Sequence, residues 1–307
     1  MVRRTTSLYV LLGGTLASLA GAASPLPLVI WHGLGDTFDN PGLQSVADLY
    51  TSIYPGASTH IIHLADDGGG DRKASYFGSL HGQMELVCDQ LSSNPNLTSP
   101  LAPHGFHALG FSQGGLFMRG YVEACNLPRV HTLVTFGSPH NGISEFVKCK
   151  TTDWLCRTAF GWLNANKWSD WVQSNIVPAQ YYRHPSSEEM VIIPKESVWF
   201  AEVVEDGEVT WLTERELYQE DWIGLKRLDE AGKLKFLKTG GPHMHITDEL
   251  LAEVYTKYLW QPEGVVAREV DGRAFNERLM TLAEPPIGDE SGRYGGDMQE
   301  PLLQVQN

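Results

Sequence analysis

A glycine-flanked serine motif constrains the fold of this chain more than any other feature. The motif is Gly110-Phe111-Ser112-Gln113-Gly114, which follows an apolar run that suits a buried strand and precedes apolar residues at helical spacing. In such a strand-to-helix turn, only residues almost without side chains fit beside the serine, and the serine hydroxyl stays exposed at the top of the sheet. The pair Gly114-Gly115 would start a helix poorly unless another backbone passed close by. The motif therefore predicts a nucleophile elbow, with Ser112 as the nucleophile of a hydrolase.

Strand-like and helix-like segments alternate along the middle of the chain. The apolar patterns predict strands at 26–31, 58–64, 104–111, 130–136, 190–193, 197–204 and 234–237, and helices at 44–53, 82–91, 116–124 and 248–260. We expect Gly68-Gly69-Gly70 to break the chain. A length of 307 residues with 42% hydrophobic content suits one globular domain. The alternation predicts an α/β fold with a mostly parallel sheet covered by helices on both faces.

A helical segment at about 143–185 interrupts this pattern with many aromatic side chains. They are Trp154, Phe160, Trp162, Trp168, Trp171, Tyr181 and Tyr182. Two interpretations stay open: the rings pack on the core, or the segment is a cap that forms an apolar groove over the active site.

The two ends of the chain differ from its middle. Arg3 and Arg4 precede an uncharged apolar stretch that ends in Ala20-Gly21-Ala22, so residues 1–22 are predicted to be a secretory signal peptide. Beyond Val265 the chain turns polar, and we expect residues 265–307 to be a disordered tail. The catalytic domain is then predicted at 25–262.

Cysteine content and charge limit the compartment and the partners. The four cysteines are an even number without metal-ligand spacing, which favours disulfides in an oxidising lumen and no metal site. Asn96-Leu97-Thr98 is an N-glycosylation acceptor. A net charge of −14 without a basic stripe argues against nucleic acid as a partner. No second stretch is long and apolar enough for a membrane span, so we expect no stable membrane insertion. We also expect a monomer.

A serine nucleophile needs a histidine base, an acid and donors for the oxyanion. In α/β-hydrolases the base follows the last strand, where His243 stands directly after a Gly-Gly-Pro run, with His245 as its nearest competitor. His32-Gly33, after the first strand, stands where the loop that donates an oxyanion amide is expected. The backbone N–H groups of Leu34 and Gln113 are therefore the predicted donors. This chemistry needs no cofactor.

Five stretches of the sequence together resemble the palmitoyl-protein thioesterase family. They are Val29-Ile30-Trp31-His32-Gly33-Leu34-Gly35-Asp36, Gly110-Phe111-Ser112-Gln113-Gly114-Gly115, Pro194-Lys195-Glu196-Ser197-Val198-Trp199-Phe200, Leu217-Tyr218-Gln219-Glu220-Asp221-Trp222-Ile223-Gly224-Leu225-Lys226 and the Gly-x-His around His243. The resemblance runs from about Pro25 to Trp260, and the combination is far more specific than the elbow motif alone.

The resemblance implies an α/β-hydrolase fold with an inserted helical lipid-binding cap, which the aromatic segment would form. It implies hydrolysis of the thioester between a long fatty acyl chain and a cysteine, so S-acylated proteins or long-chain acyl thioesters would be the substrates. The compartment would be a lysosomal or vacuolar lumen, or the protein would be secreted. The resemblance also implies Ser112 as nucleophile, His243 as base, and the disulfides Cys88–Cys125 and Cys149–Cys156.

The acid departs from the family's pattern. The family places an aspartate after a strand, shortly before the equivalent of Pro194. Here Tyr181-Tyr182-Arg183-His184-Pro185 runs almost directly into Glu188, so we expect that strand and an adjoining helix to be missing. Glu189 stands where the aspartate is expected and a glutamate can serve as the acid; Glu188 and Asp221 are the alternatives. The gap fits a true isoform, a gene-model error or an inactive protein.

Three functions stay open. The first is an acyl-protein thioesterase that forms a serine acyl-enzyme. The second is an oxygen-ester lipase, because Phe136-Gly137-Ser138-Pro139-His140-Asn141-Gly142 resembles the loop after the elbow helix in many lipases. The third is a catalytically impaired lipid-binding homologue, which the gap before Glu188 suggests.

Overall fold

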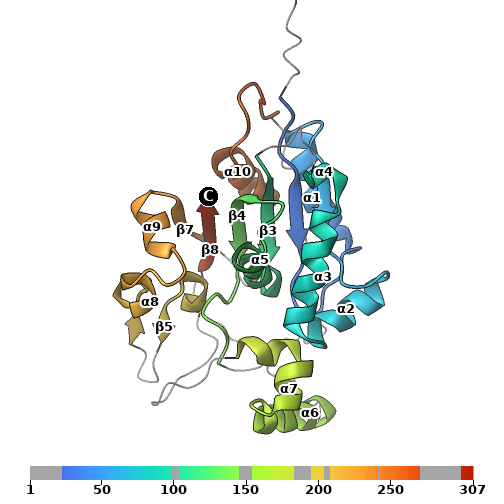
Figure 1. The fold of residues 1–307 in the computed structure, drawn as a ribbon, viewed down its shortest axis with the longest axis vertical. Coiled ribbons are helices and arrows are strands. Elements are labelled where there is room, and N and C mark those ends of the chain that lie inside the picture. The colour runs from blue at the N-terminus through green and yellow to red at the C-terminus, as the bar shows by residue number, and fades with distance from the viewer. Residues whose placement is uncertain are drawn as a thin grey trace, which may run out of the picture.

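A computed structural model describes residues 23–98, 104–144, 154–182, 195–203, 208–240, 243–269 and 299–306. It contains a six-stranded sheet in the order β2-β1-β3-β4-β8-β7 and a separate pair, β5 and β6 (Figure 1). The strands are β1 Leu28–Trp31, β2 Thr59–Ile61, β3 Phe106–Phe111, β4 Val130–Phe136, β5 Glu202–Val203, β6 Val209–Thr210, β7 Leu234–Gly240 and β8 Gln299–Gln306. The helices are α1 Pro41–Ile53, α2 Gly68–Tyr76, α3 Leu80–Ser92, α4 Pro95–Thr98, α5 Gln113–Ala124, α6 Trp154–Asn166, α7 Asp170–Asn175, α8 Glu216–Gln219, α9 Leu225–Glu230 and α10 Asp248–Tyr258, with 3-10 turns η1 Val177–Tyr181, η2 Lys195–Trp199 and η3 Leu212–Glu214.

Strand direction brings several loops to one edge of the sheet. Strands β1 to β4 are mutually parallel, as the alternating sequence pattern predicts. Strand β8 is antiparallel to both β4 and β7, so β7 runs in the same direction as β1 to β4. The carboxyl ends of β1, β3 and β7 therefore lie at the same edge. This is the arrangement of an α/β-hydrolase fold.

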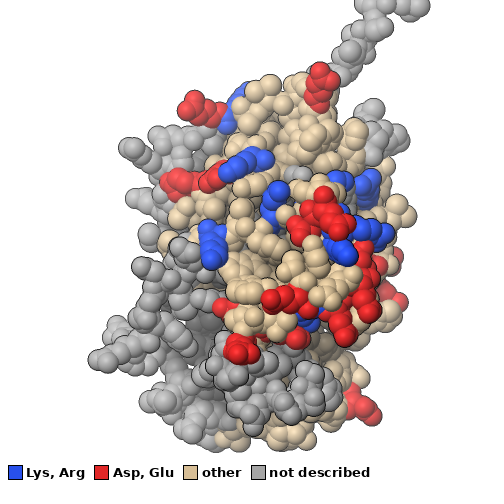
Figure 2. Space-filling view, turned by 90° about the vertical axis from the view of Figure 1, so that its left-hand side faces the viewer, with Lys and Arg blue, Asp and Glu red and all other residues tan. Residues whose placement is uncertain are grey.

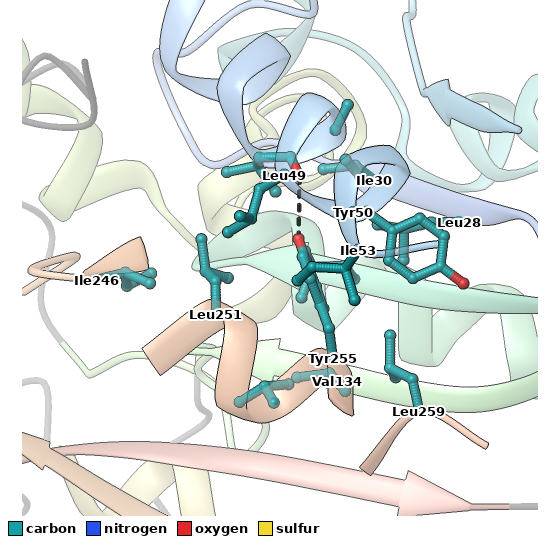
Figure 3. Close-up of a cluster of buried hydrophobic side chains, with 14 of the residues drawn as sticks. Leu28, Ile30, Leu49, Tyr50, Ile53, Val134, Ile246, Leu251, Tyr255 and Leu259 are labelled. Carbon is teal, nitrogen blue, oxygen red and sulfur yellow. Dashed lines mark hydrogen bonds between the residues drawn. The ribbon is translucent and has the colours of Figure 1, made fainter. Parts of the chain in front are cut away.

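Helices cover both faces of the sheet because successive strand residues point to opposite faces. Leu28 and Ile30 of β1 belong to a core with α1 and α10, whereas Val29 and Trp31 belong to a second core with α3 and α5. In the first core, drawn in Figure 3, the fully buried Tyr255 of α10 donates its hydroxyl proton to a backbone carbonyl of α1 at 3.2 Å. Fully burying a large apolar side chain contributes about 1.5–3 kcal/mol, so these two layers hold the sheet between them.

The end of the chain forms a strand inside the sheet, which differs from the disordered tail expected over 265–307. Strand β8 lies between β4 and β7, with Val305 opposite both Leu133 and Leu234. Without β8, the facing edges of β4 and β7 would leave backbone N–H and C=O groups without partners. The apolar pair Leu302-Leu303 suits a strand that fills this position. Strand β8 thus joins β4 to β7 in the sheet, running opposite to both.

The domain also extends past its expected boundary at 262. The backbone N–H of Arg268 donates to the carbonyl of Ile53 at 2.8 Å, and Val265 and Ala267 pack against the first core. The polar composition of this segment could not indicate these contacts, because they join it to residues far away in the sequence.

Two local predictions differ from the structure. The glycines at 68–70 begin helix α2 rather than breaking the chain, because the Asp67 carboxylate accepts the N–H of Gly70 at 2.8 Å and caps the helix. The strand expected at 197–204 is instead the turn η2 followed by the two-residue strand β5. The predicted signal peptide at 1–22 and the strand at 190–193 lie outside the described residues.

The aromatic segment forms α6, α7 and η1 at one end of the molecule (Figure 1). Three of its indole side chains are substantially exposed: Trp162 (54%), Trp168 (39%) and Trp171 (58%). Tyr181, by contrast, packs edge-on against Phe117 of the elbow helix α5. Core packing therefore explains Tyr181 but not the exposed indoles. Among the described residues, no helix has the length and apolar character required to cross a bilayer.

Deleting residues 299–307 should weaken the attachment of β7, because β8 is the only sheet neighbour that β7 has in the described structure. We expect a lower melting temperature and slower labelling of Ser112 by a fluorophosphonate. Deleting Asn307 alone, which follows the last residue of β8, is the control and should change neither. Unchanged melting and labelling in the longer deletion would contradict the role of β8.

Candidate active site

Ser112 occupies the strained turn between β3 and α5. Its backbone has φ 50° and ψ −121°, a conformation that residues with a Cβ rarely adopt, and its N–H donates to the carbonyl of Phe136 at 2.7 Å. A Cβ added to Gly110 would collide with the backbone of Gly115, and one added to Gly114 would collide with the carbonyl oxygens of Trp31 and His32. The flanking glycines are thus required by close backbone approach, which is the physical basis of the motif.

His243 lies beside this serine. It follows β7, whose carboxyl end is at the same edge as that of β3, and its Nε2 is 3.3 Å from Ser112 Oγ. That separation is long for a hydrogen bond, as is common in catalytic pairs before substrate binds. For His245, the competitor considered from sequence, the described structure shows no hydrogen bond to Ser112. The arrangement can transfer a proton between a serine hydroxyl and an imidazole.

The segments that carry the two expected oxyanion donors both adjoin Ser112. A Cβ added to Gly33 would lie 3.3 Å from Ser112 Cβ, so the loop that carries Leu34 packs directly on the elbow. Gln113 is the first residue of α5, where backbone N–H groups are left without helical partners. Neither the Leu34 N–H nor the Gln113 N–H has an acceptor in the part of the chain that the structure describes.

The side chain of Gln113 is held by residues that the sequence did not reveal. It is buried, its Nε2 donates to the carbonyl of Ser75 in α2 at 3.0 Å, and its Oε1 accepts the hydroxyl of Tyr181 at 2.7 Å. The aromatic segment therefore contacts the residue that follows the nucleophile. No local pattern could identify this contact, since Tyr181 lies 68 residues away in sequence.

A buried ion pair supports the oxyanion loop. His32 Nε2 lies 2.8 Å from Asp71 Oδ2, with both side chains almost fully buried. Burial alone lowers the pKa of His32, but the hydrogen bond to Asp71 and its charge outweigh this and hold the pKa above its usual value. Burial alone raises the pKa of Asp71, but the hydrogen bond from His32, its charge and two backbone N–H donors hold that pKa below its usual value. Sequence analysis identified His32 only as part of a loop and missed Asp71.

The third catalytic residue expected from the sequence is the acid. Glu189 and Glu188 lie outside the described residues. Asp221 ion-pairs with Arg227 at 2.7 Å and accepts the N–H of Lys226 at 3.0 Å, so its carboxylate is engaged in the α8–α9 turn. Figure 2 shows the side of the molecule that carries α8 and α9, where acidic and basic side chains are mixed.

Asp248 is a buried carboxyl that the sequence analysis did not single out. It stands at the start of α10, five residues after His243, and neither carboxyl oxygen has a hydrogen-bond partner among the described residues. Burial, with a smaller contribution from Glu249, raises its pKa to about 6. Such a group is uncharged in an acidic compartment.

The predicted disulfides and glycosylation site lie partly within the described residues. A disulfide joins Cys88 of α3 to Cys125, the residue directly after α5, so it fastens the far end of the elbow helix. Cys149 and the side chain of Cys156 lie outside the described residues. Asn96 is exposed on α4.

Two hollows are present on the described surface, with cavity volumes of about 530 Å³ beside Trp260 and about 370 Å³ beside Phe200. Neither is lined by Ser112 or His243. Segments 145–153 and 183–194, on either side of the aromatic helices, lie outside the described residues.

Comparison with known proteins gives consistent matches. The sequence profile of the family described as Palmitoyl protein thioesterase matches residues 27–190 and 186–243, and the two matches meet where the sequence analysis located the gap. Palmitoyl-protein thioesterase-dolichyl pyrophosphate phosphatase fusion 1 of Schizosaccharomyces pombe is 39% identical over 169 residues, which are 55% of this chain and 26% of the fusion protein. The chain thus spans about a quarter of that relative's length.

Two other relatives match over nearly their full length. Palmitoyl-protein thioesterase 1 of Caenorhabditis elegans is 26% identical over 296 residues, covering 82% of this chain and 97% of the relative. Palmitoyl-protein thioesterase 3 of Dictyostelium discoideum is 23% identical over 287 residues, covering 78% and 93%. Among solved structures, the RedJ thioesterase from the prodiginine biosynthetic pathway in Streptomyces coelicolor matches 55% of this chain and 67% of its own, with a TM-score of 0.34 and 19% identity.

The close approach at Gly114 predicts the effect of a single methyl group. Gly114→Ala should displace the Trp31–His32 backbone and slow fluorophosphonate labelling of Ser112 by about 10²-fold or more, because an oxyanion donor moves with that segment. The matched control is Gly161→Ala in α6, where an added Cβ has no neighbour within 4 Å. That variant should keep its labelling rate and gain up to about 1 kcal/mol of helix stability. Equal labelling by both variants would be contrary to the elbow geometry.

The raised pKa of Asp248 predicts a pH-dependent stability. Its folded-state pKa of about 6 exceeds the value of about 3.9 for an unfolded aspartate, so the folded state binds the proton more tightly. The free energy of unfolding of the wild type, relative to Asp248→Asn, should therefore rise as pH falls from about 6 to about 4. Denaturant unfolding at several pH values measures this difference. Glu253→Gln, which removes an exposed carboxylate from the same helix, should show little such dependence, and a flat difference for Asp248→Asn would refute the assignment.

Proposed function

Because the chain belongs to the palmitoyl protein thioesterase family, we propose that it hydrolyses thioesters between long-chain fatty acyl groups, such as palmitoyl, and cysteines of lipidated proteins. The observation that carries the proposal is the separation of 3.3 Å between His243 Nε2 and Ser112 Oγ at the strained elbow. The names of the relatives, which are thioesterases of palmitoyl proteins, support the choice of substrate.

The geometry supports an acyl-enzyme mechanism. Ser112 Oγ attacks the thioester carbonyl while His243 Nε2 accepts the hydroxyl proton, and the N–H groups of Leu34 and Gln113 stabilise the tetrahedral oxyanion. Collapse of the intermediate expels the cysteine thiolate, which takes the proton from His243. Water, activated by the same imidazole, then attacks the acyl-serine and releases the fatty acid.

We propose two candidates for the carboxylate that orients His243. Glu189 is our first candidate because it stands where the family has its aspartate. Glu300 is a second, because the register of β8 places it opposite Thr239, four residues before His243 and at the edge of the sheet where Ser112 lies. A carboxylate at either position would stabilise the imidazolium that forms during the reaction.

The setting of the reaction follows from the same reasoning. We propose that residues 1–22 direct the chain into the secretory pathway, that Asn96 is glycosylated, and that a second disulfide joins Cys149 to Cys156. The mature chain then acts as a monomer in a lysosomal or vacuolar lumen, or after secretion, and its partners are S-acylated proteins and long-chain acyl thioesters. A relative named as a lysosomal thioesterase, from Drosophila melanogaster, supports this setting.

Turnover of a palmitoyl thioester, compared with a matched oxygen ester, tests the proposal. Ser112→Ala and His243→Ala should each lower kcat by at least about 10³-fold, whereas His245→Ala should stay near the wild type. Glu189→Gln and Glu300→Gln identify the acid, which is whichever variant loses rate. A strong preference for the oxygen ester would favour a lipase, and a folded chain whose Ser112 takes no fluorophosphonate would favour a binding protein.

A further inference from the structure

The ring of His32 has an acceptor at each nitrogen. Nδ1 lies 2.9 Å from the carbonyl oxygen of Gly33, and Nε2 lies 2.8 Å from Asp71 Oδ2. A carbonyl oxygen has no proton to give, and the carboxyl of Asp71 is held in its ionised form by its donors. Both ring nitrogens must therefore donate, so His32 is a buried imidazolium rather than a neutral imidazole.

This bond to Gly33 fixes the direction of a neighbouring donor. The carbonyl of Gly33 and the N–H of Leu34 belong to one planar trans peptide, so they point in opposite directions. Holding the carbonyl against His32 therefore aims the Leu34 N–H away from His32. Gly33 packs against Ser112, and the Leu34 N–H has no acceptor in the described structure. A charged donor on the carbonyl also polarises the peptide and strengthens its N–H as a donor.

Asp71 fixes this arrangement through its hydrogen bonds. It is fully buried and, besides the His32 ring, accepts the N–H of Phe38 at 2.8 Å and the N–H of Leu64 at 2.7 Å. Because His32 and Phe38 flank Leu34 on both sides, a single carboxylate anchors both ends of the oxyanion loop.

Helix α2 supplies a second anchor one turn later. Ser75 Oγ accepts the N–H of Gly35 at 2.9 Å, and the Ser75 carbonyl accepts the side chain of Gln113 at 3.0 Å. Residues 71 and 75 lie on the same face of α2, which is the face turned toward the elbow. The helix therefore contacts the segments that carry both predicted oxyanion donors.

We propose that His32 and Asp71 are positioning residues that aim the Leu34 amide at the oxyanion, an inference that rests on the proposed function. Neither side chain touches the substrate. Their contribution is to keep one peptide plane in a single orientation while charge develops on the substrate oxygen, where a preorganised donor has its largest effect.

Asp71→Asn and His32→Gln test the proposal. Losing one oxyanion donor lowers kcat by about 10²–10³-fold, so misorienting one should lower kcat by about 10–100-fold with little change in KM. Affinity for a long-chain alkyl trifluoromethyl ketone, which forms a tetrahedral oxyanion on the serine, should fall in parallel. Affinity for the corresponding long-chain alcohol should not change, because that molecule carries no charged oxygen. Ser75→Ala is a milder variant, for which we expect a several-fold loss of kcat.

Tyr255→Phe is the matched control for lost stability. It removes a buried hydroxyl bond in the core between α1 and α10, so it should lower the melting temperature without changing kcat or the ketone affinity. If Asp71→Asn and His32→Gln behave like Tyr255→Phe, with lower melting temperatures but kcat and ketone affinity within about twofold of the wild type, the positioning role is wrong.

Fluorophosphonate labelling of Ser112 tests the positioning role independently of the substrate. If the wild type turns over no palmitoyl thioester, the rate of fluorophosphonate labelling of Ser112 replaces kcat, since that reaction also places an oxygen in the oxyanion hole. A decrease of about 10-fold or more in the two variants would then support the inference without the substrate assignment. Equal labelling rates, or no labelling of the folded wild type, would overturn it.

Discussion

The close approach of two backbones at the elbow is the constraint on which the rest of the structure depends. Gly114 lies against the carbonyl oxygens that end β1, and Gly33 lies against Ser112. This contact forces Ser112 into a positive φ and presses the loop after β1 onto the nucleophile. A turn this tight is stable only when its surroundings hold it, and here they are the two buried cores on either side of β1 and β3. The proposed nucleophile and one proposed oxyanion donor are thus positioned by the same packing.

The base depends on a different and longer-range constraint. His243 reaches Ser112 only because β7 runs parallel to β3, and β7 is joined to the sheet through β8. A parallel strand in the position of β8 would end at the catalytic edge and could deliver an acid from its carboxyl end. Antiparallel β8 instead begins at that edge, with Glu300 in its second position. The antiparallel β8 therefore still joins β7 to the sheet parallel to β3.

Local sequence patterns predicted the parts of this protein that local physics determines. Strands β1, β3 and β4 and helices α1, α3, α5 and α10 follow from apolar spacing, and the Gly-x-Ser-x-Gly turn follows from steric limits on neighbouring residues. Contacts between distant segments were not predictable in this way. Asp71 meets His32 across 39 residues, Tyr181 meets Gln113 across 68, and β8 meets β4 across more than half of the chain. A buried polar residue leaves no periodic signal, and a lone apolar run in a polar tail does not show which strands it will join.

In the proposed reaction, thioester chemistry makes the oxyanion side of the site the more important one. A thiol has a pKa of about 8.5, so its thiolate leaves readily and needs less help from a proton donor than an amine or alkoxide does. Formation of the tetrahedral oxyanion then carries a larger part of the barrier, and donors fixed before the reaction lower that barrier most. Helix α2 fixes them through Asp71 and Ser75, whereas the acid acts only by orienting His243. If this chain is a thioesterase, α2 preserves the part of the proposed machinery on which thioester cleavage depends most, wherever its acid lies.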